Sequence, residues 1–155
     1  MTQKYALAFD TESNGFLEDA TILWTFCAKD MRTKQRWAFG GPEGVYADRA
    51  LIQQLLLNSD MIVCHNQIKH DLPLLNKLKI AGKQHWGHAK IVDTFTLSSL
   101  LNPDRPTPPG CKSGHSLKAF GMLSGGEVEK VEQETWDIYD PNMLTRCESD
   151  VDLTE

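Results

Sequence analysis

Three acidic segments of the 155-residue sequence contain the residue types that metal-dependent chemistry needs. The first is Asp10-Thr11-Glu12, which follows the apolar run of residues 4–9. Side chains alternate along a strand, so a strand over residues 4–12 places Asp10 and Glu12 on the same face. Two carboxylates on one face repel each other unless a cation lies between them. The pair therefore marks a candidate metal site, and an ordinary polar strand end is the alternative.

The other two acidic segments belong to expected helices. Asp71 opens an apolar helix, where a helix cap or a partner for the helix dipole is an alternative to metal binding. Asp150 lies on a late helix, where a solvated acidic face is the alternative. Asp140 and Asp152 are rival carboxylates for Asp150, which is favoured because Val151 and Leu153 follow it.

The elements that must position these residues follow from the apolar patterns. Strands are expected at residues 4–9, 20–28, 35–39, 61–64 and 91–92, and helices at 47–57, 71–78, 94–101, 116–120 and from 141 onward. The first three strands are joined by short turns, which predicts an antiparallel meander. Strands and helices then mix, so the predicted fold class is α/β with a mixed β-sheet flanked by helices. Residues 102–113 contain four prolines and predict a long loop.

Length and composition limit the remaining possibilities. A chain of 155 residues suits one domain, residues 1–155, and its 41% apolar content is normal for a globular protein. The formal net charge of −5 argues against binding nucleic acid by bulk electrostatics. It leaves open an enzyme that meets phosphate through bound cations, because a cation reverses the sign of the local field.

The sequence also carries expectations about location and cysteine use. It has neither an apolar run of about 18 residues nor a signal-peptide pattern at its start, so no membrane partner and a cytoplasmic location are expected. Cys27 and Cys64 lie in apolar runs and are expected to be buried small hydrophobes. The sequence ends a few residues after Asp150, which suggests an excised domain or one followed by a C-terminal continuation.

Taken together, the three acidic segments resemble the three motifs of the DEDD superfamily of exonucleases. Three further stretches are similar to the proofreading domain of phage family-A DNA polymerases: His65-Asn66-x-x-Lys69-His70-Asp71-x-Pro73-x-Leu75, Val92-Asp93-Thr94-x-x-Leu97-Ser98-x-Leu100 and Gly114-His115-Ser116-Leu117-Lys118-Ala119-Phe120-Gly121. The resemblance covers essentially the whole chain in order. It implies a ribonuclease-H-like fold and a 3′→5′ exonuclease that hydrolyses single-stranded DNA ends to nucleoside 5′-monophosphates.

The resemblance also implies a ligand set, a cofactor and partners. Asp10, Glu12, Asp71 and Asp150 are the expected ligands of two divalent cations, Mg²⁺ or Mn²⁺. Such a pair of ions can activate a water and stabilise the departing 3′ oxygen. The expected partners are a single-stranded DNA 3′ end and a DNA polymerase domain or another replication protein. The setting is phage DNA replication and proofreading, hence the host cytoplasm.

One position departs from the family pattern. Relatives have a Tyr four residues before the last Asp, where it orients the attacking water, or a His five residues before; here these positions are Arg146 and Thr145. Arg146 cannot act as a base, because it stays protonated. It is expected either to bind the scissile phosphate and stabilise charge, or to form a surface ion pair. His115 and Tyr139 are candidate replacements for the Tyr.

This departure keeps two alternative functions open. One is an exoribonuclease of the same superfamily, because discrimination of the 2′ hydroxyl depends on the shape of the pocket. The other is a catalytically silent module that binds nucleic acid.

The expected substrate contacts are less sharply defined. They are Thr11, Phe16, Leu17, Asn66, His70 and His115. Phe16 and Leu17 suit an apolar wedge against terminal bases, and core packing is the alternative. Asn66 is equally a loop cap, and His70 is more simply a side chain packed beside the site.

Three further positions support the site only indirectly. Asp93 is expected to support the site from behind the ligands or to cap the following helix. Lys112 and Lys118, together with His115, suit a basic edge that faces phosphate, and a solvated face is the alternative.

Overall fold

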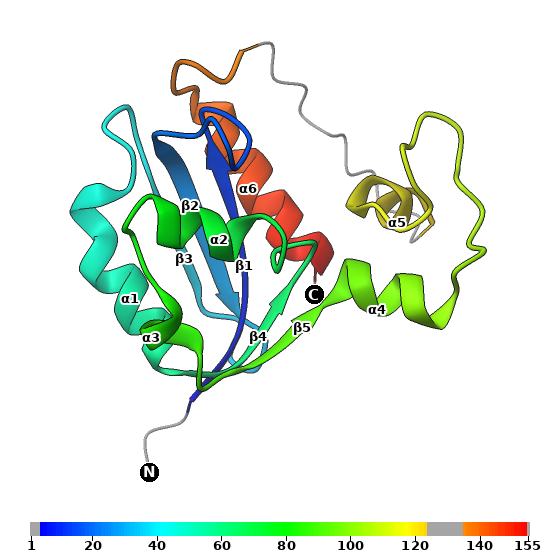
Figure 1. Cartoon of the computed structure of the whole chain (residues 1–155), viewed down its shortest axis with the longest axis horizontal. Helices are drawn as coiled ribbons and strands as arrows, with labels where there is room; N and C mark the ends of the chain where they lie inside the picture. The colour runs from blue at the N-terminus through cyan, green and yellow to red at the C-terminus, as the bar shows by residue number, and fades with distance from the viewer. Residues whose placement is uncertain (1–3, 124–134, 155) are drawn as a thin grey trace.

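The computed structural model describes residues 4–123 and 135–154, and its centre is a five-stranded mixed sheet of order β3-β2-β1-β4-β5 (Figure 1). The strands are β1 (Tyr5–Ser13), β2 (Leu23–Asp30), β3 (Arg36–Gly40), β4 (Ser59–Cys64) and β5 (Lys90–Asp93). β1, β2 and β3 pair antiparallel, whereas β4 pairs parallel to β1 and β5 parallel to β4. The predicted α/β class, the mixed sheet and its antiparallel meander are confirmed.

Helices cover both faces of this sheet (Figure 1). They are α1 (Arg49–Leu57), preceded by the 3-10 turn η1 (Tyr46–Asp48), then α2 (Asp71–Lys77), α3 (Lys83–Trp86), α4 (Thr94–Leu101), α5 (Leu117–Leu123) and α6 (Pro141–Thr154). α1, α2 and α3 pack on one face, and α6 packs across β1 and β2 on the other. α4 and α5 lie to one side of the sheet, joined by the predicted loop.

The two faces of β1 are covered by two different groups of residues. Leu7 and Phe9 belong to the large core beneath α1, α2 and α3, and both are fully buried. Ala8, between them, belongs to a small cluster with Cys27 of β2 and Cys147 of α6. The alternation assigns the even-numbered positions of β1 to the α6 face, which determines where Asp10 and Glu12 lie.

Several element boundaries differ from those expected. β1 continues past Asp10 to Ser13, because its pairing with β2 extends as far as Ser13 opposite Leu23. α3 was not predicted, since four residues are too few to show a helical period. Within residues 4–123 and 135–154, we find no helix with the length and apolarity required to cross a bilayer.

Candidate active site

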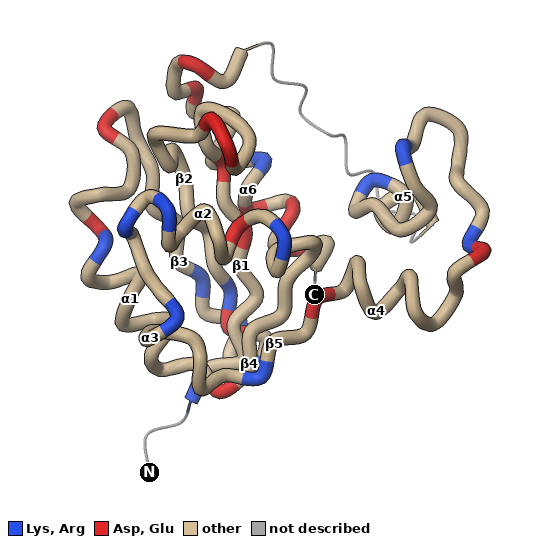
Figure 2. The backbone as a smooth tube through the Cα atoms, in the orientation of Figure 1, with Lys and Arg blue, Asp and Glu red and all other residues tan. Residues whose placement is uncertain are grey.

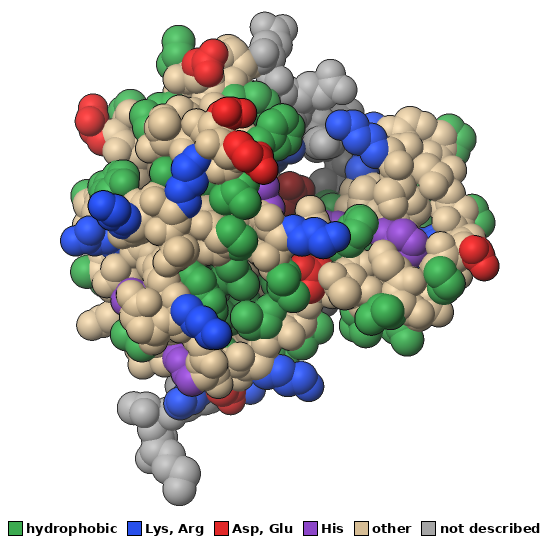
Figure 3. All heavy atoms as spheres, in the orientation of Figure 1, with side chains coloured by type: hydrophobic (Ala, Val, Ile, Leu, Met, Phe, Trp, Pro, Cys, Tyr) green, Lys and Arg blue, Asp and Glu red, His purple; other side chains and the backbone are tan. Residues whose placement is uncertain are grey.

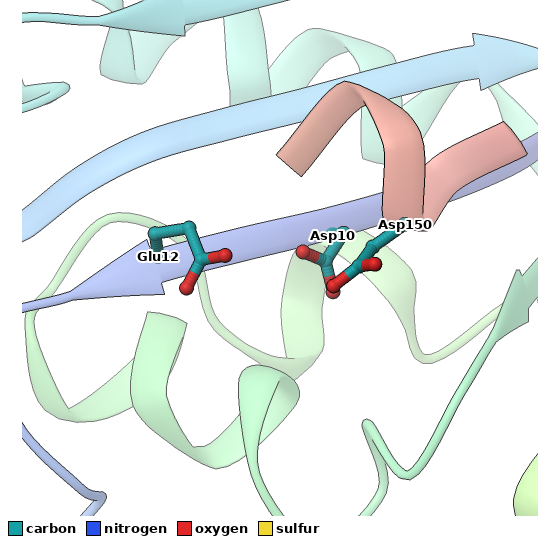
Figure 4. A group of neighbouring side chains, drawn as sticks. All are labelled: Asp10, Glu12 and Asp150. Carbon is teal, nitrogen blue, oxygen red and sulfur yellow. The ribbon is translucent and has the colours of Figure 1, made fainter. Parts of the chain in front are cut away.

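Three of the four predicted ligands converge at the end of β1. Asp10 and Glu12 of β1 and Asp150 of α6 each offer a carboxylate oxygen, and these atoms lie within 4.8 Å of one another. Figure 4 shows Asp10 and Glu12 on the same side of the strand, with the Asp150 carboxylate reaching down from the helix toward Asp10. The structure therefore brings together carboxylates from opposite ends of the sequence, in a group with the size and chemistry of a cation site. We call these three residues the acidic cluster.

α6 is fixed on the sheet by contacts on both sides of Asp150. The Cys147 thiol donates to the backbone oxygen of Asp10 at 3.1 Å. Asp152 is 3.1 Å from Lys29 Nζ and 2.5 Å from Arg36 Nη2, which attaches the helix to β2 and β3. Asp152 therefore anchors the helix to the sheet, whereas the Asp150 carboxylate points to Asp10 and Glu12.

The other rival carboxylate, Asp140, also has a structural role. Its Oδ1 accepts a hydrogen bond from the backbone N–H of Asn142 at 2.8 Å, at the start of α6. Asp140 therefore caps the helix that carries Asp150.

Asp71 lies beside the acidic cluster, at the start of α2, and its charge acts on Asp10. Its Oδ1 accepts a short hydrogen bond from the hydroxyl of Thr11, whose side chain points to the opposite face from Asp10 and Glu12. Asp71 is buried, with 5% of its surface exposed. His70 Nδ1 is 3.7 Å from Asp71 Oδ2, and the pKa of His70 is raised chiefly by this neighbour. Thr11, predicted as a substrate contact, here holds a carboxylate in place.

The electrostatics of the cluster favour a positive charge between the carboxylates. The pKa of Asp10 is raised well above its ordinary value, first by burial and then by the negative charges of Asp71, Asp150 and Glu12. Asp10 is half-buried by surface area, and the other acids lie around its carboxylate. A cation would relieve both the desolvation and the repulsion. Oxygen donors suit Mg²⁺ or Mn²⁺, so these residues fit the predicted metal.

Arg146 contacts the cluster directly, so the surface ion pair considered for it is wrong. Its Nε is 2.9 Å from Glu12 Oε1, and both side chains are largely buried. The N–H does not point along a hydrogen-bond direction, so the contact is an ion pair without a well-aligned hydrogen bond. The guanidinium carbon also lies 4.9 Å from the centre of the Trp136 ring. Two partners therefore hold the charge of Arg146 at the edge of the site.

A cleft of about 190 Å³ opens next to Glu12. Its lining is Thr11, Glu12, Ser13, Gly15, Phe16, His70, Trp136 and Arg146. Phe16 is 77% exposed, so core packing does not explain it, whereas Leu17 packs against the main core. Trp136 was missed from the sequence, because the segment before α6 has no regular pattern that would direct it to the site.

The remaining predicted residues have clear structural partners. Asp93 accepts hydrogen bonds from the backbone N–H groups of Phe95 and Thr96, which confirms that it caps α4. It also accepts from the N–H groups of Asn66 and Ile68 and so shapes the loop before Asp71. Asn66 itself is exposed and has a left-handed φ of 61°.

His115 lies against α4. Its Nδ1 is 2.8 Å from the hydroxyl of Ser98, and its ring packs edge-on against Phe95. With 9% of its surface exposed, its part in substrate binding stays a prediction. Of the other proposed groups, Lys118 donates to the backbone of Gly110, and Tyr139 packs near Trp24.

The two predicted cysteines are buried as expected. Burial raises the pKa of Cys64 to about 12, which keeps it a protonated thiol. Both therefore act as small apolar side chains.

Charges are distributed unevenly around the site. In Figure 2 acidic positions gather where β1, α2 and α6 meet. Figure 3 shows a hollow between the sheet and the part formed by α4 and α5, with acidic side chains inside it and Lys or Arg side chains at its edges. This arrangement suits a ligand whose anionic groups meet a cation inside and basic side chains around it.

Comparisons with known proteins identify the fold. No protein-family model matches the sequence, and no curated protein matches it. Among solved structures, an E. coli exonuclease I complex with a dA16 oligonucleotide is 16% identical with a TM-score of 0.63, and the match covers 98% of this chain and 39% of that one. Brucella melitensis NrnC is 18% identical with a TM-score of 0.57, covering 96% and 67%. A structure described as the apo form of a nuclease is 17% identical with a TM-score of 0.59, again covering 96% and 67%.

These likenesses establish a shared fold. The chain has a ribonuclease-H-like α/β fold, as predicted, and spans 39% of the length of the exonuclease I chain. A particular closeness to phage polymerase domains is not among these findings and stays a prediction. The chemistry of this chain has to be argued from its own residues.

Proposed function

We propose that this chain is a metal-dependent 3′→5′ exonuclease domain that releases nucleoside 5′-monophosphates from single-stranded DNA. The observation that carries the proposal is the acidic cluster, in which three carboxylates from β1 and α6 lie within 4.8 Å of one another. The shared fold supports it, as do the oligonucleotides present in structures of E. coli exonuclease I. Fold alone does not specify chemistry, so the cluster is the stronger argument.

The residues that would hold the metal are Asp10, Glu12, Asp71 and Asp150. The raised pKa of Asp10 supports this assignment, because four acids gathered without a cation repel one another. When bound, two divalent cations would lower the pKa of a water and stabilise the departing oxygen. Thr11 would hold Asp71 in place through its hydroxyl, and Cys147 would keep α6 against β1.

Other residues of the cleft would bind the nucleic acid. Phe16 offers an exposed aromatic ring on which a base can stack, a contact that tolerates any sequence. Asn66 and His70 precede Asp71 in the chain and remain proposed substrate contacts. A place in phage DNA replication, with a polymerase domain or another replication protein as partner and the host cytoplasm as location, belongs to the same proposal.

Substitution of Asp150 tests the proposed activity. We expect Asp150→Asn to abolish mononucleotide release from a 5′-labelled single-stranded DNA in Mg²⁺ or Mn²⁺ while circular dichroism stays unchanged. The matched control is Asp152→Asn on the same helix, which removes a carboxylate that faces Lys29 and Arg36 and should retain activity. Wild-type rates in Asp150→Asn would refute the assignment. Running the same assay on RNA of equal sequence decides between DNA and RNA.

A second candidate function rests on Arg146. Its ion pair with Glu12 occupies a predicted metal ligand, which favours a silent module that only binds strand ends. Under this alternative the wild-type chain binds a single-stranded DNA 3′ end but releases no mononucleotide, even at high protein concentration with Mn²⁺. Release that depends on Asp150 would exclude it.

A further inference from the structure

The guanidinium of Arg146 contacts Glu12, one of the three residues of the acidic cluster. The distance from its Nε to Glu12 Oε1 is 2.9 Å, and 17% of the Arg146 side chain and 10% of the Glu12 side chain are exposed. Trp136 covers the guanidinium at 4.9 Å from its ring centre. A guanidinium stays protonated at any pH at which the protein is folded. The site therefore contains a permanent positive charge of its own.

The positive charge of Arg146 lies at the end of the acidic cluster that Glu12 forms. Asp150 and Arg146 lie on the same helix, four residues apart, but the Arg146 side chain reaches Glu12. Asp10 and Asp150 approach each other at the other end (Figure 4). A divalent cation that uses Glu12 as a ligand must share that carboxylate with the guanidinium, and like charges repel strongly where water is scarce.

We propose that Arg146 is a resident counter-ion of Glu12 that competes with a divalent cation for this carboxylate. The inference rests on the metal dependence of the proposed function. Arg146 is in this sense a positioning residue: it neutralises one acid in the metal-free protein and makes the two ends of the cluster unequal. Its removal takes away the charge that competes for Glu12 and repels a cation, so metal affinity rises.

The test is a titration of the full chain with Mn²⁺, followed by electron paramagnetic resonance in the absence of nucleic acid. We expect Arg146→Met to bind Mn²⁺ about tenfold more tightly than wild type, or to bind one more ion in the same concentration range. Arg146→Lys keeps the charge and should stay within about threefold of wild type. The matched control is Arg105→Met, which removes an arginine that stacks on Phe120 at 4.8 Å, away from the cluster.

Each outcome decides one point. Mn²⁺ affinity in Arg146→Met equal to or below that of wild type, in a protein with an unchanged circular dichroism spectrum, overturns the counter-ion role. If Arg146→Met does not fold, Arg146→Gln, which keeps a polar amide, decides by the same criterion. Loss of the counter-ion role leaves the nuclease proposal intact if wild type still binds Mn²⁺ and releases nucleotides. No Mn²⁺ binding by any variant would instead overturn the metal-dependent function itself.

Discussion

Replacement of Asp10 by Asn should stabilise the metal-free protein and remove its response to Mg²⁺. The pKa of Asp10 is raised by burial and by the charges of Asp71, Asp150 and Glu12. Because the folded pKa exceeds the unfolded one, the folded state binds more protons between these two values. The free energy of unfolding therefore falls as the pH rises through the folded pKa. Asn carries no charge, so at neutral pH the Asp10→Asn protein does not lose this part of its free energy of unfolding.

The magnitude follows from the charges that surround Asp10. Two unit charges 4 Å apart near a protein surface repel by about 4 kcal/mol. Arg146, paired with Glu12, offsets part of the repulsion. We therefore expect Asp10→Asn to gain about 1–3 kcal/mol without metal. For a chain of this size each kcal/mol raises Tm by about 2–4 °C.

Thermal unfolding in EDTA and in Mg²⁺ measures both effects. Wild type should gain about 2.7 kcal/mol when Mg²⁺ is at 100 times its Kd, whereas Asp10→Asn should gain little. The matched control is Asp152→Asn. Burial alone would raise the pKa of Asp152, but hydrogen bonds from Arg36 and Lys29 outweigh it and lower the pKa. This variant should lose up to about 1 kcal/mol and keep the Mg²⁺ response. A lower Tm of Asp10→Asn in EDTA, or an undiminished Mg²⁺ gain, would refute the reasoning.

Three further predictions concern the neighbours of the cluster. Phe16→Ala should weaken binding of single-stranded DNA by about 1–3 kcal/mol in fluorescence anisotropy, with Leu101→Ala, another exposed apolar residue, unchanged. Arg146→Tyr introduces the residue that the exonuclease resemblance predicts at this position and should raise the rate of mononucleotide release about tenfold or more; no rise would show that Arg146 does not limit the rate. The carboxylate of Asp93 accepts hydrogen bonds from four backbone N–H groups, and Asp93→Asn weakens them. We expect the free energy of unfolding, measured in urea, to fall by about 2 kcal/mol. An unchanged urea midpoint would contradict the structural role of Asp93.

Local patterns were enough to predict most of the fold. The apolar run before Asp10 and the alternation of strand side chains predicted that Asp10 and Glu12 share a face, as they do. The loop of residues 102–113 and the helix that begins at Thr94 were likewise readable, because proline and polar caps act locally. The predicted strand ended at residue 9, whereas β1 continues to Ser13 because its last residues pair with β2.

Long-range contacts were beyond such patterns. Val151 and Leu153 favoured Asp150 over its rival carboxylates, but only the family resemblance directed it to Asp10. The pairing of Arg146 with Glu12 and its stacking on Trp136 had no signal in the sequence, because each depends on where α6 settles on the sheet. The side-chain hydrogen bond of Thr11 to Asp71 was also missed, because it depends on how α2 packs against β1.

The position of α6 has a consequence for how the protein matures. Cys147 donates to the backbone of Asp10 across a separation of 137 residues, so the ribosome must add all the residues between them before this contact can form. Contacts between residues so distant in sequence tend to form late and slowly. A nascent or partly folded chain would therefore contain the sheet without the complete acidic cluster, which forms only when α6 docks on β1 and β2.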